Sequence, residues 1–323
     1  MQLTDIQAPI KEQLTEFDKL LNNSLKHDVE LVTTMSDYVL SMQGKHMRPL
    51  FLLLSASLHG DINEKCHNAA IFIELIHTAS LIHDDVVDEA YMRRSKSSVN
   101  ALMRSKAAVL LGDYVLSRGL KIAVKNKLYS TIDMVSQVIE EMSVGELMQS
   151  ANSVRLNTTS QDYFDVVRRK TALLMACCGA SGAESVGADK QSVERMFKFG
   201  ELLGIAFQIK DDILDFNGET STGKSNLNDV RERKLTLPLL TVMEKLDSLE
   251  RKKILALLRE PIISESSVSK IRDYVFDNGG IEQAQNKMTQ LKEEAVSLLD
   301  IYPDSPVKRS LIMYADFILT RNK

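Results

Sequence analysis

The chain has no tryptophan, six prolines and three cysteines among its 323 residues. The low proline content permits long helices, because proline breaks or kinks a helix wherever it falls in the interior. The cysteines, Cys66 and the neighbours Cys177 and Cys178, fit neither a disulfide framework nor a zinc spacing, and we expect small buried thiols. The sequence therefore argues against a disulfide-stapled fold and against redox chemistry.

Long apolar runs are also missing, since no stretch approaches the roughly 18 uninterrupted apolar residues that a bilayer-spanning helix needs. The first twenty residues carry acidic side chains early and lack an apolar signal-peptide core. We therefore expect no transmembrane segment and a cytoplasmic location. A net charge of -4 provides no general attraction for nucleic acid, so any anion site must come from local basic clusters.

The chain is rich in Leu, Ala, Lys, Glu and Met, which favour helix by intrinsic propensity. Apolar residues recur every three or four positions, as in Ala69, Ile73 and Ile76, whereas the alternation typical of strands is scarce. Helix breaks are expected at 44–49, 60–63, 152–159, 187–189, 217–228 and Pro261. The pattern predicts an all-α bundle with mostly short connections, in which functional side chains project inward. Length alone leaves the number of domains open.

Two DDxxD clusters, each at the end of an apolar helical run, carry the strongest functional signal. Their members are Asp84, Asp85, Asp88, Asp211, Asp212 and Asp215. The outer aspartates of each cluster are four positions apart on one helix face, so their carboxylates can converge. Two carboxylates about 6 Å apart in a cleft repel by roughly 3 kcal/mol at an effective dielectric near 20, and a cation would offset this. Hard oxygen ligands without clustered His or Cys predict magnesium shared with a substrate phosphate.

A solvated acidic face is the alternative reading of a single DDxxD. Like charges four positions apart on an exposed helix cost only a few tenths of a kcal/mol, so repulsion does not exclude it. The repetition of the motif, its apolar neighbours and the paired arginines after the first cluster favour the metal site.

Basic residues gather near the acidic clusters and predict anion binding. Lys45 and Arg48 precede a helix with an early proline, a geometry that presents charge and backbone donors together. Arg93 and Arg94 follow the first cluster, where guanidinium groups can grip phosphate bidentately. Further basic groups contain Lys170 with Thr171, and Lys224 with Lys234. For Arg168, Arg169 and Lys210 we expect solvated surface positions.

Five motifs together resemble one known family. GKHMRP, HTASLIHDDVVDEAYMRR, RKT, GIAFQIKDDILDF and GKSNLNDVRERKLTLP occur in the order and approximate spacing of the trans-polyprenyl diphosphate synthases, from about Gly44 to Pro238. The resemblance implies a single all-helical domain over residues 1–323, of the isoprenoid synthase type. It also implies a central deep cavity with the two acidic clusters facing each other across its mouth, and a homodimer.

The activity implied by the resemblance is a trans-prenyltransferase. It would condense isopentenyl diphosphate with dimethylallyl, geranyl or farnesyl diphosphate and release geranylgeranyl or a longer all-trans polyprenyl diphosphate. Magnesium, as three ions with substrate bound, is the implied cofactor. No dedicated protein base is found in the sequence, and in this family the released diphosphate is the usual proton acceptor.

Site residues carry over by position in the motifs. Asp84, Asp88 and Asp211 are the implied principal magnesium ligands, and Asp85, Asp212 and Asp215 support them. The residues implied to hold isopentenyl diphosphate are Lys45, Arg48, His77 and Arg94. Those implied to hold the allylic diphosphate are Arg93, Lys170, Thr171, Gln208, Lys224 and Lys234. Lys170, Thr171 and Lys234 are also implied to act in catalysis beside the aspartates.

Two departures from the family pattern concern loops. Ser95 and Arg233 stand where the family commonly has glycine, so local backbone angles there come at a cost. The terminal Arg321 to Lys323 resembles a basic tail found in some members, although we expect a frayed terminus.

Product length is argued from helix geometry. Ser80, Ala79, Ile76 and Phe72, at four, five, eight and twelve positions before Asp84, share the face that points down the expected cavity. Each helical turn rises about 5.4 Å, similar to one isoprene unit. Short-chain members of the family have an aromatic floor at the four or five position, which this chain lacks, so we expect geranylgeranyl or longer, with six to eight units favoured. Small residues that merely ease helix packing are the alternative reading.

Rival functions remain open from the sequence. A class I terpene cyclase also uses DDxxD on helices, but it has no use for the set Lys45, Arg48 and Arg94. A catalytic large subunit of a two-component heptaprenyl-type synthase, dependent on a small partner protein, is a second alternative.

Overall fold

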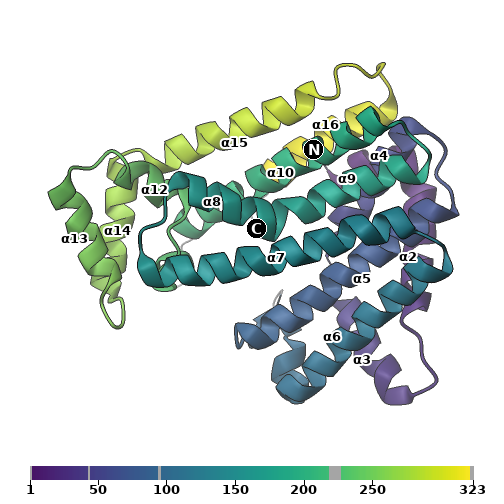
Figure 1. The fold of residues 1–323 in the computed structure, drawn as a ribbon, viewed down its shortest axis with the longest axis horizontal. Coiled ribbons are helices and arrows are strands. Elements are labelled where there is room, and N and C mark those ends of the chain that lie inside the picture. Colours follow the sequence, from purple (N-terminus) through teal and green to yellow (C-terminus); the bar gives the residue numbers. More distant parts are fainter. Residues whose placement is uncertain (1, 43, 94–95, 218–226, 321–323) are drawn as a thin grey trace. The chain divides into compact units, whose positions relative to one another are not determined.

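The computed structural model describes residues 2–42, 44–93, 96–217 and 227–320. Regular structure in these residues is almost wholly helical, which confirms the all-α prediction (Figure 1). The α-helices are α1 (Leu3–Gln7), α2 (Lys11–Ser24), α3 (Glu30–Ser41), α4 (Met47–His59), α5 (Glu64–Val87), α6 (Val99–Lys125), α7 (Tyr129–Arg155), α8 (Ser160–Val167), α9 (Leu173–Ser185), α10 (Lys190–Asn217), α11 (Asn228–Arg231), α12 (Leu237–Met243), α13 (Ser248–Leu258), α14 (Glu265–Asp277), α15 (Gly280–Ser297) and α16 (Pro306–Thr320). A 3-10 helix, η1 (Ala8–Ile10), a π-helix, η2 (Arg168–Ala172), and the strands β1 (Met92–Arg93) and β2 (Lys96–Ser97) are also present. No described helix is long and apolar enough to cross a membrane.

Most expected helix breaks are confirmed within the described residues. Helix α4 ends at His59 and α5 begins at Glu64, and Pro261 lies between α13 and α14. The first break is shorter than expected, because α4 begins at Met47 and includes Pro49 in its first turn. Proline is tolerated there because the N–H groups of the first turn have no partner within the helix.

The chain forms two compact units, each assembled from three segments. Unit 1 contains Met1–Ser136, Cys177–Phe197 and Pro303–Tyr314, and unit 2 contains Gln137–Ala176, Lys198–Tyr302 and Ala315–Lys323. The first acidic cluster belongs to unit 1 and the second to unit 2. A single domain over residues 1–323 and a common cavity mouth for the two clusters therefore stay predictions.

Helices α5 and α6 lie side by side in unit 1 (Figure 1). The side chain of Asn63 begins α5 by accepting hydrogen bonds from the backbone N–H groups of Lys65 and Cys66 at 2.9 and 3.3 Å. The middle of α5 is buried on most of its circumference, as expected for a helix without a strongly polar face. Helix α6 approaches α5 closely at Gly119, where an added Cβ would lie 3.3 Å from Cδ2 of Phe72 and 3.4 Å from Cβ of Leu75.

A two-residue antiparallel pairing follows α5, with Met92 opposite Ser97 and Arg93 opposite Lys96. The sequence pattern did not predict these strands, because two residues are too few to show alternation. Helix α6 then begins after Ser98, whose hydroxyl accepts from the N–H of Ala101 at 3.0 Å. Arg104 interrupts α6 with φ 64° and ψ 158°, outside the helical region.

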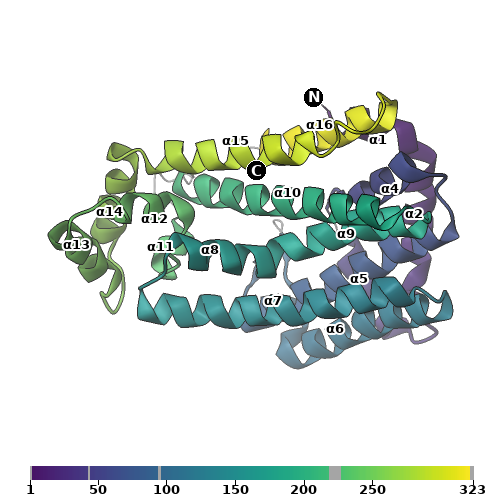
Figure 2. The same cartoon turned by 45° about the horizontal axis from the view of Figure 1, so that its top comes forward.

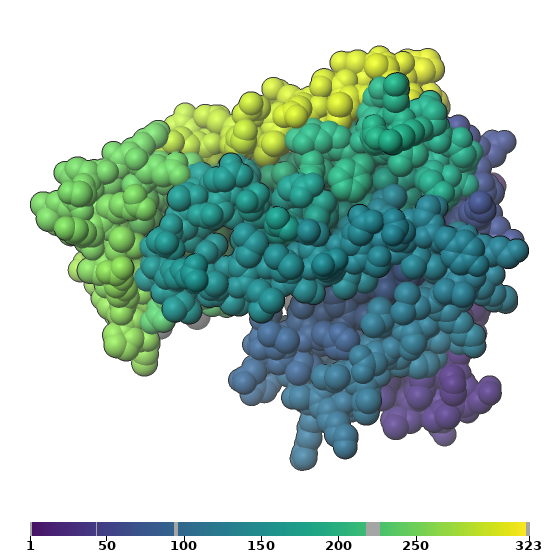
Figure 3. Space-filling model, viewed as in Figure 1, coloured from purple at the N-terminus to yellow at the C-terminus, as the bar shows by residue number. Residues whose placement is uncertain are grey.

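Unit 2 is built around α8, α10, α12 and α15, with α12 packed against both α8 and α15 (Figure 2). Thr159 and Asp162 form a capping box that begins α8. A Cβ at Gly280 would lie 2.3 Å from the carbonyl oxygen of Pro238, so glycine permits the contact between α15 and α12. Figure 3 shows α13 and α14, in green, at one end of this unit.

Candidate active site

The first acidic cluster ends helix α5 in unit 1. Asp84 and Asp88 are exposed, whereas Asp85 is only 3% exposed. The guanidinium group of Arg93 donates from Nε to both carboxylate oxygens of Asp85 at 2.9 Å, and from Nη2 to Oδ1 at 2.7 Å. Arg93 thus engages both oxygens of Asp85, whereas Asp84 and Asp88 lie at the surface.

A Schellman turn at the end of α5 leads the chain from the acidic cluster to Arg93. The N–H of Ala90 donates to the carbonyl of Asp85 at 2.9 Å, and the N–H of Glu89 donates to that of Val86 at 3.3 Å. Glu89 takes the left-handed position of the turn, with φ 49°. The turn thus reverses the chain so that Arg93 reaches back to Asp85.

Arg48 and His77, 29 positions apart in sequence, are in direct contact. Arg48 Nη1 lies 2.7 Å from Nε2 of His77. A guanidinium nitrogen only donates, so Nε2 of His77 accepts and its proton resides on Nδ1. The Nε of Arg48 is buried and makes no hydrogen bond among the described residues. A buried donor of this kind can be satisfied by an anionic ligand.

The first turn of α4, which carries Arg48, is held by the C-terminal helix α16. The hydroxyl of Tyr314 donates to the carbonyl of Met47 at 2.9 Å, and its ring stacks on Phe51 with centroids 5.4 Å apart. Burial raises the pKa of Tyr314 well above its ordinary value, so the phenol remains a donor. Lys45 lies just before this turn in an exposed segment.

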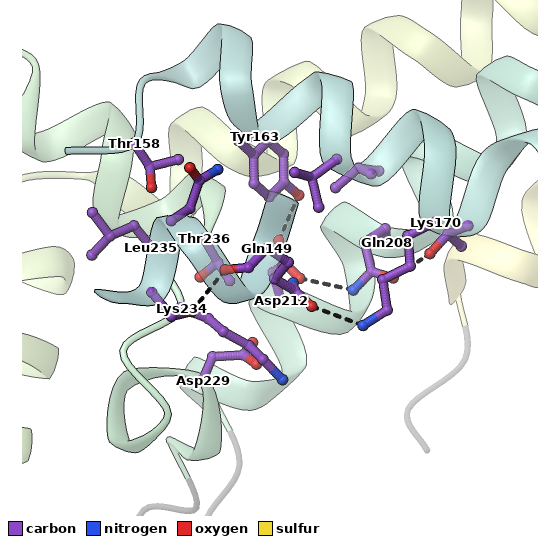
Figure 4. Close-up of a pocket in the computed structure, with 15 residues that line it drawn as sticks. Gln149, Thr158, Tyr163, Lys170, Gln208, Asp212, Asp229, Lys234, Leu235 and Thr236 are labelled. Atoms are coloured by element: carbon purple, nitrogen blue, oxygen red, sulfur yellow. Dashed lines mark hydrogen bonds between the residues drawn. The ribbon is translucent and has the colours of Figure 1, made fainter. Parts of the chain in front are cut away.

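The second acidic cluster lies near the end of α10 in unit 2. Asp212 is 2% exposed and accepts from the hydroxyl of Tyr163 at 2.5 Å and from Nε2 of Gln208 at 3.1 Å (Figure 4). Burial, with the neighbouring charge of Asp229, raises the pKa of Asp212 to about 7. Both oxygens of Asp212 are thus engaged by protein donors, as they are for Asp85, and Asp211 is half-buried beside it.

Asp215 connects the second cluster to the helix that follows it in the structure. Its two oxygens accept from the backbone N–H groups of Asn228 and Asp229 at 3.1 and 3.2 Å, which satisfies the first donors of α11. Burial raises the pKa of Asp215. Burial, followed by the charge of Asp215, raises the pKa of Asp229 to about 6.

A cavity of about 220 Å³ in unit 2 brings several predicted site residues together (Figure 4). Its lining includes Lys170, Thr171, Gln208, Asp212, Asp229 and Lys234. Thr171 Oγ1 donates to Oε1 of Gln208 at 3.2 Å, and Lys170 Nζ donates to Oε1 of Gln149 at 2.7 Å. Lys170 also pairs with Glu146, and Lys234 with Glu232. The cavity therefore combines ammonium groups, a hydroxyl and carboxylates, a mixture suited to a phosphate group with a cation.

Arg168 and Arg169 differ from the expectation of solvated surface positions. Arg168 Nε lies 2.6 Å from the carboxylate of Glu201, which is buried, and Arg169 pairs with Glu141. Burial alone would raise the pKa of Glu201, but Lys198 and Arg168 outweigh it and hold that pKa below its ordinary value. The two arginines thus fasten η2, and with it Lys170, to neighbouring helices.

Arg94, Ser95, Lys224 and the residues 321–323 lie outside the described residues, so the expectations for them stay predictions. Of the positions expected to limit product length, Phe72, Ile76 and Ala79 are buried and Ser80 is half-buried on α5. A Cβ at Gly119 would lie 3.3 Å from Cδ2 of Phe72, which shows that the ring lies against α6.

The donor set fits magnesium in its chemistry. Asp84, Asp88 and Asp211 offer the hard oxygens that magnesium prefers. Among the described residues, no three Asp, Glu, His or Cys side chains gather as a ready metal site. Magnesium commonly binds through one or two protein carboxylates and takes its other ligands from water and substrate phosphate.

Sequence reasoning missed Tyr163, Gln149 and Tyr314. Tyr163 lies 49 positions from Asp212, and Tyr314 lies 267 positions from Met47. No local pattern links such pairs, and an aromatic residue within an amphipathic helix most simply predicts a core position. Their roles become visible only from the contacts.

Comparison with known proteins shows one consistent family. The family model described as Polyprenyl synthetase matches residues 29–275. The octaprenyl diphosphate synthase of Haemophilus influenzae is 30% identical over 326 residues, covering 100% of this chain and 98% of the relative.

Solved structures agree with this match. The polyprenyl synthase of Caulobacter crescentus, complexed with calcium and isoprenyl diphosphate, has a TM-score of 0.88 at 27% identity and covers 100% of this chain and 98% of its own. The geranylgeranyl pyrophosphate synthase of Bacteroides thetaiotaomicron has a TM-score of 0.83 at 34% identity and covers 99% of each chain.

Proposed function

We propose that this chain, which belongs to the polyprenyl synthetase family and is therefore a prenyltransferase, extends an allylic diphosphate with isopentenyl diphosphate. The product would be geranylgeranyl or a longer all-trans polyprenyl diphosphate. The observation that carries the proposal is the cavity of unit 2, where Lys170 and Lys234 lie among carboxylates of the second acidic cluster and its neighbour Asp229.

The allylic diphosphate would bind in this cavity. Lys170 and Lys234 supply positive charge, and the amide group of Gln208, which accepts from Thr171 and donates one of its two N–H groups to Asp212, has a second N–H group to offer. Such preorganised donors stabilise the charge that develops on the departing diphosphate as the carbon–oxygen bond breaks. Glu146 and Gln149 hold Lys170 in place before substrate arrives.

Isopentenyl diphosphate would bind through Lys45, Arg48, His77 and Arg94. The buried Nε of Arg48, without a partner among the described residues, supports a role for this guanidinium in holding an anion. His77 fixes the orientation of the Arg48 guanidinium through the contact at Nη1. Anchoring the diphosphate would hold the double bond in a reactive pose, which lowers the entropic part of the barrier.

Magnesium would be held by Asp84 and Asp88 of the first cluster and Asp211 of the second, as three ions when substrate is bound. When bound it would supply Lewis-acid stabilisation of the diphosphate leaving group. Asp85 and Asp212 would act differently from these three. Asp85 would fix the position of Arg93, and Asp212 would fix those of Tyr163 and Gln208. For the final proton loss we propose the released diphosphate as the acceptor.

The product length is the finer part of the proposal. Named relatives include octaprenyl and geranylgeranyl synthases, so similarity does not decide the length. Residues Ala79 and Ser80 are small, and on the helix face that leads away from Asp84 the first bulky aromatic side chain is Phe72, twelve positions away. We propose a product of about six to eight isoprene units, because no aromatic side chain stands four or five positions before Asp84 to form a floor.

One assay tests the activity, the length and the need for a partner. Purified chain is incubated alone with magnesium, isopentenyl diphosphate and farnesyl diphosphate, and the products are sized by chromatography. We expect a ladder of prenyl diphosphates longer than farnesyl. Absence of any condensation by the chain alone, restored by a second protein, would instead support the two-component alternative, while a cyclic hydrocarbon would support a terpene cyclase.

Alanine variants test the metal ligands. Asp84→Ala and Asp211→Ala should each lower kcat by roughly a hundredfold or more with the fold intact, because each removes a carboxylate from magnesium binding. Asp37→Ala and Asp300→Ala, at exposed positions of unit 1 and unit 2, serve as matched controls. Near-normal turnover in either of the first two variants would refute the assignment.

A further inference from the structure

Lys234 is placed in the cavity by a Schellman turn that ends α11. The N–H of Lys234 donates to the carbonyl of Asp229 at 2.8 Å, and the N–H of Arg233 donates to that of Val230 at 3.0 Å. The turn closes Asp229 and Lys234 onto each other, and both side chains line the cavity. Any shift of the turn therefore moves an acidic and a basic group of the cavity together.

The left-handed position of this turn is occupied by Arg233, with φ 59°. Glycine adopts such an angle at no steric cost, whereas a residue with a Cβ does so at a cost in free energy. A costly residue persists where its side chain makes interactions that glycine could not make. The side chain of Arg233 makes three such interactions.

The half-buried guanidinium group of Arg233 bonds the C-terminal end of α13. Its Nε donates to the carbonyl of Leu258 at 3.1 Å, and its Nη2 donates to those of Glu260 and Pro261 at 2.8 and 3.2 Å. Leu258 is the last residue of α13, and its carbonyl, which lacks a partner within the helix, carries partial negative charge that a guanidinium group complements. Glu260 and Pro261 lie in the segment that follows the helix. One side chain thus joins the turn to a helix that does not itself line the cavity.

We propose that Arg233 is a positioning residue, which anchors the turn of Asp229 and Lys234 to α13 and so holds Lys234 ready for the allylic diphosphate. This inference rests on the proposed function, in which Lys234 binds that diphosphate. Arg233 itself touches no substrate. Its contribution is to restrict the motion of Lys234 before binding, because a preorganised donor loses less entropy when the ligand arrives.

Two substitutions separate anchoring from stability. Arg233→Ala removes the three donors but keeps the costly backbone angle, whereas Arg233→Gly removes the donors and relieves the angle. We expect both variants to raise KM for farnesyl diphosphate roughly five- to tenfold, as loss of charge-assisted hydrogen bonds predicts, with KM for isopentenyl diphosphate changed less than twofold. Arg233→Gly should melt at a higher temperature than Arg233→Ala without recovering KM.

Arg259→Ala is the matched control, since Arg259 is an exposed arginine at the end of the same helix α13. It should leave both KM values within twofold of wild type. The inference would be overturned if Arg233→Gly had the wild-type KM for farnesyl diphosphate. It would also be overturned if this KM recovered from Arg233→Ala to Arg233→Gly in parallel with the melting temperature. Lys234→Ala separates the binding role of Lys234 from the anchoring role of Arg233. If Lys234→Ala raises KM for farnesyl diphosphate but the Arg233 variants do not, only the anchoring is overturned. If Lys234→Ala leaves this KM unchanged, the binding role and the anchoring are both overturned.

Discussion

The middle aspartate of each DDxxD cluster is the most buried of the three. Asp85 and Asp212 are 3% and 2% exposed, and protein donors engage both oxygens of each carboxylate. From the sequence, the middle aspartate of each cluster is expected to support the metal beside the principal ligands. Burial separates them, because a carboxylate removed from water needs hydrogen-bond donors, and those donors then occupy its oxygens.

The pKa of Asp212 predicts a pH dependence of stability in protein treated with a chelator. Its pKa rises from 3.8 in the unfolded chain to about 7 in the folded protein, so the folded state binds the proton more tightly. The stability this group contributes is complete below about pH 3.8 and is lost as the pH rises through about 7, at up to about 1.4 kcal/mol per pH unit.

Urea unfolding of wild type and Asp212→Asn at pH 5 and pH 8 measures this contribution. Wild type should lose more of its free energy of unfolding between the two pH values than the variant does. Asp300→Asn, at an exposed position, should follow wild type. Parallel pH profiles for wild type and Asp212→Asn would contradict the prediction.

From the backbone angles of Arg104 we predict that Arg104→Gly is more stable than Arg104→Ala. Its φ of 64° and ψ of 158° lie in a region that residues with a Cβ occupy at a cost of about 1–3 kcal/mol. Arg104→Gly should therefore exceed Arg104→Ala in free energy of unfolding by about 1 kcal/mol, after allowance for the greater entropy of glycine in the unfolded chain. Equal stability of the two variants in urea would show that this backbone angle is relaxed in solution.

At the scale of elements, one face of α5 links the acidic cluster to the expected product path. Ala79 is 3% exposed and lies five positions before Asp84, so a larger side chain there must occupy space beside the helix. Ala79→Tyr should shorten the longest product toward farnesyl diphosphate. Lys65→Tyr, exposed on the first turn of α5, is the control, and an identical product ladder from both variants would reject a floor at position 79.

A second element-scale prediction concerns α16 and α4. Tyr314→Phe keeps the stacking on Phe51 but removes the hydroxyl that donates to Met47. The free energy of unfolding should fall by about 1 kcal/mol, and KM for isopentenyl diphosphate should rise a few fold because Arg48 lies in the turn that is loosened. Tyr129→Phe, at a tyrosine that is 64% exposed at the start of α7, should change neither quantity. An unchanged KM in Tyr314→Phe would limit Tyr314 to a structural role.

For the whole molecule we expect a homodimer, with a mass in light scattering twice that of the chain. Helix α6 exposes apolar side chains on one face, with Leu110, Leu120 and Val124 59%, 40% and 55% exposed. An exposed apolar stripe of this kind is typical of an interface. Leu110→Asp combined with Val124→Asp should therefore yield monomers. Leu249→Asp, at an equally exposed leucine of α13, should remain dimeric, and a dimer that survives the double substitution would exclude this face.

The amino-acid sequence is enough to predict the helical class and to find both acidic clusters, with the three cations that the structure places at them, Arg93, Lys170 and Lys234. Helical periodicity and i, i+4 spacing are local, so they can be read along the chain without knowing what each helix packs against. Only the tertiary structure shows that Tyr163 and Gln208 donate hydrogen bonds to the two oxygens of Asp212. It also shows that Tyr314 bonds the carbonyl of Met47 beside Arg48, and that Arg233, next to Lys234, bonds the end of α13. Burial and most hydrogen-bond partners depend on residues far apart in the chain, and these contacts separate carboxylates available to a metal from those that hold the site together.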